Sequence, residues 1–158
     1  MKPPFPNSYW VGSDFLAGHY PDQEQGEVAA LVATGVTRFL DLTEPGEREP
    51  YASSLPEGLV HRRLSIPDFS VPTVADMRAI LDRLDALLQE GHRVYLHCYG
   101  GLGRTGTVVG CFLVRHGCSG DEALSRIRAL RLAAGCSPHS PETDAQRTMV
   151  RSWADLKP

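Results

Sequence analysis

The sequence predicts a single α/β domain with a central, mostly parallel sheet of about five strands flanked by helices. Short strand-like apolar runs alternate with segments of helical periodicity, and this alternation is typical of a parallel sheet. The 158 residues, 42% of them hydrophobic, are enough for one compact core. No repeat, low-complexity tract or Gly/Ser linker divides the chain, so we expect residues 1–158 to form one domain.

The chain is expected to begin with an extended, Pro-rich segment over residues 2–6, followed by a β-hairpin. Apolar residues flank a Gly-Ser-Asp turn at residues 12–14, and both strands of this hairpin are expected at the edge of the sheet. Helical spacing over residues 22–34 is followed by Gly35 and then by a β-rich run over 36–42. This order predicts a helix that leads into a buried strand.

The middle of the chain predicts another strand and a long helix. The strand is expected over residues 59–66. The helix that follows has apolar residues along one face, Thr73 and Asp76 as its capping pair, and Gly91 at its end.

The last third predicts one strand and three helices. A strand over residues 93–98 runs into a glycine-rich loop, and residues 105–117, apolar on nearly every side, predict a buried helix. Another helix is expected after Asp121. The final helix is expected to begin with Ser140 as its cap and Pro141 in its first turn.

The glycine loop (residues 99–103) lies between Cys98 and Arg104, and three of its five residues are glycine. A loop of this kind, between a strand and a helix N-terminus, points several backbone N–H groups at one place and binds an oxyanion there. The arginine fork can hold two phosphate oxygens at once. The expected substrate-binding residues are Tyr99, Gly100, Gly101, Leu102, Gly103 and Arg104.

Cys98 is the predicted nucleophile. The loop N–H groups, the helix dipole and the Arg104 cation all favour its thiolate, which attacks the phosphorus of a bound monoester. Thr105 is expected to offer its hydroxyl to the sulfur when the sulfur becomes the leaving group. His97 faces the other side of the strand in this prediction, and it orients the loop through hydrogen bonds without touching substrate.

Two other interpretations of the loop are weaker. A nucleotide-binding loop of the form G-x-x-x-x-G-K-[ST] needs a lysine before Ser/Thr, and residues 99–105 contain none. Cys98 could also be a buried structural cysteine at the end of a core strand. A cysteine and an arginine on either side of a glycine loop, directly after a strand, favour the catalytic interpretation.

The segment HCYGGLGRTG, residues 97–106, resembles the H-C-x5-R-[ST] signature of cysteine-dependent protein phosphatases. The stretches LAGHYP, SIPDFSVPT and ALSRIRALR occur in the order usual for atypical dual-specificity phosphatases, including the kind that acts on cyclin-dependent kinases. The resemblance covers most of the chain. It implies a protein tyrosine phosphatase-like fold and hydrolysis in two steps through a phosphocysteine, with no metal or other cofactor.

Asp68 is the expected general acid, which protonates the oxygen of the leaving group. It lies between Pro67 and Pro72 in a stiff turn, thirty residues before Cys98, and the resemblance implies an acid at about this distance. The alternative for Asp68 is a purely structural role in the turn. Asp41, at the end of a buried strand, is a weaker candidate that we expect to stabilise a turn or to make a supporting hydrogen bond.

Gln146 is the candidate for placing the water of the second step. It falls on the same helical face as Met149, Val150 and Trp153, so an uncharged amide points inward. Related phosphatases carry a glutamine in a comparable segment that orients the hydrolytic water. The alternative is a buried hydrogen bond without a catalytic role.

Charge and composition limit the partners. The formal net charge of −3 argues against binding to nucleic acid or to a membrane surface, because both need a basic footprint. The N-terminus lacks the features of a secretory signal, so we expect a cytoplasmic protein.

The cysteines and arginines outside the loop are given structural interpretations. The cysteines lack the spacing of a metal site, and their ability to resolve an oxidised Cys98 is left open. The arginines after Asp121 are interpreted as a solvated face, with attraction of phosphorylated substrates as the alternative. The residues concerned are Cys111, Cys118 and Cys136, and Arg126, Arg128 and Arg131.

The predicted function is hydrolysis of phosphate monoesters on Tyr, Ser and Thr of phosphorylated proteins or peptides, by a monomer. The first alternative is an inositol phosphate, a phosphoinositide or another small monoester, and the lack of a cation from Tyr99 to Gly103 disfavours such polyanions. A phosphate-binding module without catalysis is disfavoured because a nucleophile, a cation and an acid are all present. Sulfur transfer and arsenate reduction use similar loops but do not explain Asp68.

Overall fold

The computed structural model describes residues 1–156 and contains one five-stranded sheet. β1 and β2 are antiparallel, and every other neighbouring pair of strands is parallel. The predicted α/β class with a mostly parallel sheet is confirmed. The strand order is β1 (Ser8–Gly12), β2 (Phe15–Gly18), β5 (Val94–His97), β3 (Arg38–Asp41) and β4 (Val60–Arg63).

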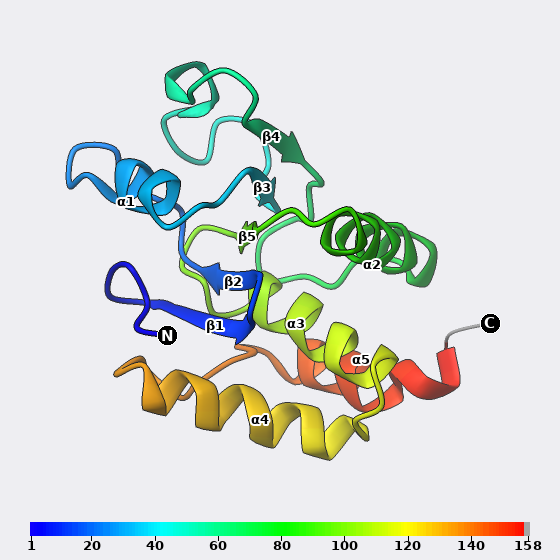
Figure 1. Cartoon of the computed structure of the whole chain (residues 1–158). Helices are drawn as coiled ribbons and strands as arrows, with labels where there is room; N and C mark the ends of the chain where they lie inside the picture. The colour runs from blue at the N-terminus through cyan, green and yellow to red at the C-terminus, as the bar shows by residue number, and fades with distance from the viewer. Residues whose placement is uncertain (157–158) are drawn as a thin grey trace.

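Helices lie on both sides of the sheet (Figure 1). On one side are α1 (Glu27–Ala33) and, beside it, the short 3-10 helix η1 (Ala52–Ser54). On the other side are α2 (Val74–Gln89) and α3 (Arg104–Arg115). The last two helices, α4 (Gly120–Ala133) and α5 (Asp144–Leu156), pack against α3. α3 is therefore enclosed between the sheet and two later helices, which is why its sequence is apolar on nearly every side.

The central strand β5 is buried on both faces. Val94 and Leu96 join the apolar cluster that also contains the buried residues of α2 and α3, whereas Tyr95 joins the cluster that contains those of α1. Side chains alternate between the two faces of a strand, so a strand covered by helices on both sides has apolar residues at successive positions.

The packing of α5 on α3 depends on Gly110. A Cβ atom at this position would lie 2.5 Å from Cγ2 of Val150, so only glycine allows the two helices to approach this closely. The long helix α2 begins as predicted, because the Thr73 hydroxyl accepts a hydrogen bond from the N–H of Asp76.

Two expectations about the elements are wrong. Only β1 lies at the edge of the sheet from the hairpin, because β2 also pairs in parallel with β5. Ser140 does not cap the last helix, which begins at Asp144, and the hydroxyl of Thr143 accepts the N–H of Gln146 instead. The Ser140 hydroxyl is used elsewhere, because it donates to the carbonyl of Leu102.

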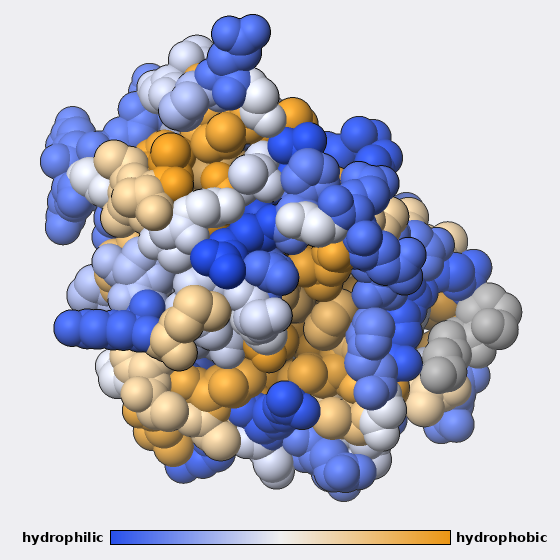
Figure 2. Space-filling view, viewed as in Figure 1, coloured by the Kyte–Doolittle hydropathy of each residue, from blue (hydrophilic) through white to orange (hydrophobic). Residues whose placement is uncertain are grey.

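The carboxyl ends of the parallel strands lie side by side, and the candidate site is located at these strand ends. Cys98 follows β5, Asp41 ends β3, and the segment with Asp68 follows β4. An apolar groove beside α1, lined by Val28 and Pro56 among others, contains none of the predicted site residues (Figure 2).

Candidate active site

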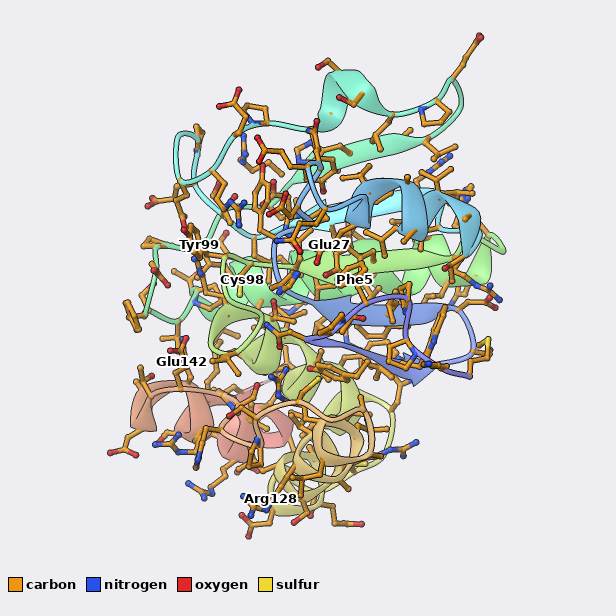
Figure 3. All side chains as sticks on the ribbon, turned by 90° about the vertical axis from the view of Figure 1, so that its left-hand side faces the viewer. Phe5, Glu27, Cys98, Tyr99, Arg128 and Glu142 are labelled. Atoms are coloured by element: carbon orange, nitrogen blue, oxygen red, sulfur yellow. The ribbon has the colours of Figure 1, made fainter. Side chains whose placement is uncertain are left out.

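Cys98 lies where β5 ends and the glycine loop begins (Figure 3). Only 3% of its surface is exposed, and its Sγ accepts a hydrogen bond from the N–H of Gly101 at 3.2 Å. A backbone N–H that points at a sulfur stabilises negative charge there. The loop therefore curls over the cysteine in the way that the sequence predicts.

Every carbonyl from Cys98 to Gly103 accepts a hydrogen bond from outside the loop. In a trans peptide the C=O and the following N–H point in opposite directions, so outward carbonyls turn the N–H groups of residues 99–104 inward. These inward N–H groups form a nest for an oxyanion. The donors, in order, are Nδ1 of His97, the N–H of Tyr20, Nδ2 of Asn7, Nη1 of Arg131, Oγ of Ser140, and both the N–H and Oγ1 of Thr107.

Gly101 is the loop residue where both the backbone conformation and a neighbouring backbone exclude a side chain. Its φ is +77°, and a Cβ atom there would lie 2.6 Å from the carbonyl carbon of Gly18 at the end of β2. Gly100 differs, because a Cβ atom at that position meets nothing within 4 Å. The tight turn of the loop against β2 thus depends on one glycine in particular.

Arg104 is 1% exposed and forms the first residue of α3. Its Nη1 and Nη2 donate to the two carboxylate oxygens of Glu47 at 2.8 and 2.9 Å, and Nη1 also donates to the carbonyl of Ile66 at 3.0 Å. Its Nε has no hydrogen-bond partner among residues 1–156. A buried N–H without an acceptor is costly, so Nε keeps a free donor beside the glycine loop.

Glu47 was not predicted, although it holds the arginine of the loop in place. Burial alone would lower the pKa of Arg104, but its hydrogen bonds to Glu47, together with the nearby Cys98 and Asp68, outweigh burial and raise it. The same hydrogen bonds lower the pKa of Glu47. The sequence signal was its place in a Pro-Gly turn shortly after β3, since residues that follow parallel strands gather at one edge of the sheet.

Asp68 lies at the opening of the site. Its Oδ1 is 3.1 Å from Nη2 of Arg104, and about half of its side chain is exposed. Oδ1 also accepts the N–H of Phe69, a residue with a φ of +60°. The structure therefore brings the expected acid next to the arginine that ends the glycine loop.

Gln146 is buried and joins the acid segment to the start of α5. Its Oε1 accepts the N–H groups of Glu142 and Thr143, each at 3.0 Å, and its Nε2 donates to the carbonyl of Ser70 at 3.3 Å. A buried hydrogen-bonding role is thus present. The placement of water by Gln146 stays a prediction.

Thr105 does not contact the sulfur through a hydrogen bond in this structure. Its hydroxyl donates to the carbonyl of Gly18 at 3.5 Å, a long hydrogen bond. A role at the leaving sulfur stays a prediction.

His97 orients the loop from behind. It is fully buried, and burial lowers its pKa from 6.5 to about 4, so the ring is neutral near pH 7. Because Nδ1 faces the carbonyl of Cys98 at 3.0 Å, Nδ1 carries the proton, and Nε2 accepts the hydroxyl of Tyr51 at 2.6 Å. The carbonyl of Cys98 therefore fixes the ring tautomer, and the Tyr51 hydroxyl satisfies the other ring nitrogen.

Asp41, the last residue of β3, is hydrogen-bonded to side chains around it. It is fully buried and accepts hydrogen bonds from Thr43, His61 and Arg63. Burial alone would raise its pKa, but the hydrogen bonds from His61 and Thr43 and the nearby His97 lower it to about 2. The expected supporting hydrogen bonds are present.

The rim of the site carries exposed aromatic side chains. Tyr99 is 49% exposed, and the Arg48 guanidinium lies 5.4 Å from the centre of its ring. Phe69, next to the acid, is 62% exposed. In Figure 3, Tyr99 and Cys98 lie at the same end of the molecule as Glu142, which comes from the segment before α5.

The remaining expectations concern cysteines, metals and membranes. All four cysteines are free, and burial raises the pKa of Cys111 to about 12, which makes this thiol unreactive. Among residues 1–156, no group of three or more His, Cys, Asp or Glu side chains could hold a metal ion. In the same described part of the chain, no helix is long and apolar enough to cross a membrane.

Comparison with known families identifies the family to which the chain belongs. Residues 18–118, well over half of the chain, match the family described as "Tc-R-P: Polymorphic toxin system, DSP-PTPase phosphatase". The chain belongs to the DSP-PTPase family. This DSP-PTPase domain is an atypical dual-specificity phosphatase of the cysteine-dependent superfamily, as the resemblance implied.

Relatives of the DSP-PTPase chain include larger proteins. It is 31% identical over 168 residues to Protein tyrosine phosphatase domain-containing protein 1 of Mus musculus, covering 94% of this chain and 22% of that protein. It is 34% identical over 76 residues to Cyclin-dependent kinase inhibitor 3 of Sus scrofa, covering 47% of this chain and 36% of that protein. The chain thus spans about a fifth of the length of the first of these relatives.

Solved structures share the fold over nearly the whole chain. Tk-PTP in its active form superimposes with a TM-score of 0.82 and 27% sequence identity, over 96% of this chain and 98% of that one. Kinase associated phosphatase superimposes with a TM-score of 0.72 and 21% identity, over 89% of this chain and 85% of that one. The second match shows the shared fold, and the family match, the mouse relative and Tk-PTP support a cysteine-based phosphatase of the protein tyrosine and dual-specificity type.

Proposed function

We propose that residues 1–158 form one catalytic domain that hydrolyses phosphate monoesters on Tyr, Ser or Thr of phosphorylated proteins or peptides, through a phosphocysteine at Cys98. The observation that carries this proposal is the ring of outward-bonded carbonyls, which turns the loop N–H groups toward the Cys98 sulfur. The unpartnered Nε of Arg104 adds a donor for a ligand oxygen. An anion-binding nest with a thiol at its base is suited to phosphoryl transfer.

In the first step, the Cys98 thiolate attacks phosphorus. The S–P bond forms as the ester P–O bond breaks, and the carboxylic acid of Asp68 gives its proton to the leaving oxygen. Arg104 holds two of the phosphoryl oxygens through Nε and Nη2. Asp68 contacts Nη2 of Arg104 at 3.1 Å, and in this mechanism it exchanges that contact for one to the leaving oxygen.

In the second step, a water molecule attacks phosphorus on the phosphocysteine. The S–P bond breaks and returns the Cys98 thiolate, the Asp68 carboxylate takes a proton from the water, and inorganic phosphate leaves. Thr105 donates its hydroxyl to the departing sulfur, and Gln146 orients the water from the start of α5. Catalysis on this account consists of positioning and charge stabilisation.

Phosphorylated proteins fit the site better than polyanionic small molecules. Tyr99, Gly100, Gly101, Leu102 and Gly103 bring backbone donors and no cation, and the exposed rings of Tyr99 and Phe69 favour an apolar peptide segment around the phosphate. Rates on a phosphotyrosyl peptide, a phosphoseryl peptide and an inositol phosphate test this choice. A preference for the inositol phosphate would contradict it.

Asp68→Asn tests the assignment of the acid. The variant should lose about 10²- to 10⁴-fold in kcat/KM with phenyl phosphate, whose leaving group needs a proton, and much less with p-nitrophenyl phosphate. Asp76→Asn, an exposed aspartate in the first turn of α2, is the matched control and should behave as the wild type. An equal loss with both esters would show that Asp68 is not the acid.

A further inference from the structure

Arg131 and Asn7 meet behind the glycine loop, although they lie at opposite ends of the sequence. Arg131, on α4, is 1% exposed, and its Nη2 donates to Oδ1 of Asn7 at 2.9 Å. Nδ2 of Asn7 in turn donates to the carbonyl of Gly100 at 2.8 Å. Nη1 of Arg131 also donates directly to the carbonyl of Gly101 at 3.3 Å. The pair therefore holds two successive peptide groups of the loop.

These contacts form a continuous chain of hydrogen bonds from a buried cation to the Cys98 sulfur. The peptide group whose carbonyl accepts Asn7 is the one whose N–H belongs to Gly101, and this N–H donates to Sγ at 3.2 Å. Each donor in the chain points away from Arg131 and toward the sulfur. Aligned hydrogen bonds polarise one another, so the positive charge of Arg131 strengthens the N–H donor at the sulfur.

The charge of Arg131 has no carboxylate partner among residues 1–156. Its guanidinium is satisfied by the carbonyls of Ser137 and Gly101 and by Asn7, and it lies over the ring of Tyr9. Burying a cation without a counter-ion is costly. Arg104 differs, because Glu47 already neutralises it. A dianionic ligand in the loop would supply the missing negative charge.

We propose that Arg131 and Asn7 are positioning residues of the phosphate site, and that Arg131 is its second cation. They act through the Gly100 and Gly101 peptide groups, which they orient and polarise toward the phosphoryl oxygens and the sulfur. Neither side chain touches substrate. The proposal rests on the function proposed for Cys98.

Asn7→Asp is the sharpest test, because it is nearly isosteric. Asn7 has a φ of +61°, which Asp and Gly tolerate better than most residues, so the backbone is kept. The aspartate neutralises Arg131 and places a carboxylate oxygen where Nδ2 faced both the carbonyl of Gly100 and Nδ1 of His19. We expect the inhibition constant for orthovanadate to rise by about tenfold or more in the variant. We also expect iodoacetamide to alkylate Cys98 of the variant more slowly than Cys98 of the wild type below neutral pH.

Further variants distinguish an effect on the phosphate site from a general loss of stability. Asn7→Gly removes the amide and keeps the backbone, and it should weaken vanadate inhibition less than Asn7→Asp does. Arg131→Gln should weaken inhibition by vanadate, and Arg131→Lys should weaken it less, because lysine keeps the positive charge. Arg128→Gln is the matched control: this arginine on the same helix is exposed and lies on the side of α4 away from Cys98 in Figure 3.

The outcomes distinguish this proposal from the proposed function. If the wild type hydrolyses p-nitrophenyl phosphate and Asn7→Asp matches Arg128→Gln in vanadate inhibition and alkylation, the role of the pair is refuted while the phosphatase assignment stands. If Cys98→Ser turns over as fast as the wild type, the proposed function itself fails. Weaker vanadate binding in Asn7→Asp at an unchanged Tm supports the proposal.

Discussion

Replacement of Arg104 by lysine measures how much the shape of the cation matters, apart from its charge. Nη1 and Nη2 of Arg104 contact Glu47, the carbonyl of Ile66 and Asp68, whereas Nε has no hydrogen-bond partner among residues 1–156. A lysine has three donors on a single nitrogen. It therefore cannot keep the bonds to Glu47 and also present two donors to the phosphoryl group.

The expected loss follows from the bonds that lysine cannot make. At least two charge-assisted hydrogen bonds to the transition state disappear, each worth about 1.5–3 kcal/mol. The sum of about 3–6 kcal/mol corresponds to a fall of about 10²- to 10⁴-fold in kcat/KM for Arg104→Lys. Steady-state kinetics with p-nitrophenyl phosphate measures this value, and the affinity for orthovanadate should fall in parallel.

Glu47→Gln is the matched comparison for this variant. It keeps Arg104 and its free Nε but removes one charge-assisted bond that holds the guanidinium, so it should cost about one such bond, roughly 1.5–3 kcal/mol. A fall of less than about tenfold for Arg104→Lys would refute the reasoning, because charge alone would then be sufficient. A larger loss for Glu47→Gln than for Arg104→Lys would also contradict it.

Two further predictions concern the loop and its support. Gly101→Ala should lower kcat/KM by about 10²-fold or more, because its φ of +77° and the nearby β2 backbone force the loop to shift, whereas Gly100→Ala has open space and should cost far less. The pKa of His97 is 6.5 in the unfolded chain and about 4 in the folded protein. As the pH falls from 6.5 to about 4, the unfolded state therefore takes up a proton before the folded state does. The free energy of unfolding should drop by about 3 kcal/mol over this pH range.

Each of these two predictions has a result that would contradict it. Equal activities of the two alanine variants, measured with the same ester, would show that Gly101 is not under the constraint described. For the second, Tm is followed from pH 6.5 to about 4 for the wild type and for His97→Asn. A Tm that falls equally in both would assign the acid sensitivity to other groups.

Local sequence patterns predicted the strand, the glycine loop and the buried helix, because the chemistry of this unit lies in consecutive residues. Cys98, Arg104 and the loop glycines come together whatever the rest of the chain does. The position of Asp68, as distinct from its role, was predictable for a related reason, since a stiff turn after a strand of a parallel sheet places it beside the carboxyl ends of the strands. The structure brings it to 3.1 Å from Arg104.

Residues whose partners are distant in sequence were not predicted. The role of Glu47 depends on which turn reaches Arg104, and no local pattern states this. Arg131 was assigned to a solvated face, yet it follows Ile127 by four residues and so lies on the buried side of α4. That spacing was the available signal. Ser140 was misassigned because its hydroxyl bonds to the loop carbonyl of Leu102, a tertiary contact.

The central claim is that the reaction passes through a covalent phosphocysteine at Cys98. The direct test is mass spectrometry of the protein quenched with denaturant during turnover of p-nitrophenyl phosphate, using Asp68→Asn so that the second step is slowed and the intermediate accumulates. The account predicts the added mass of one phosphoryl group on the peptide that contains Cys98, and none in Cys98→Ser. A phosphoryl group on another residue, or turnover that survives in Cys98→Ser, would contradict it.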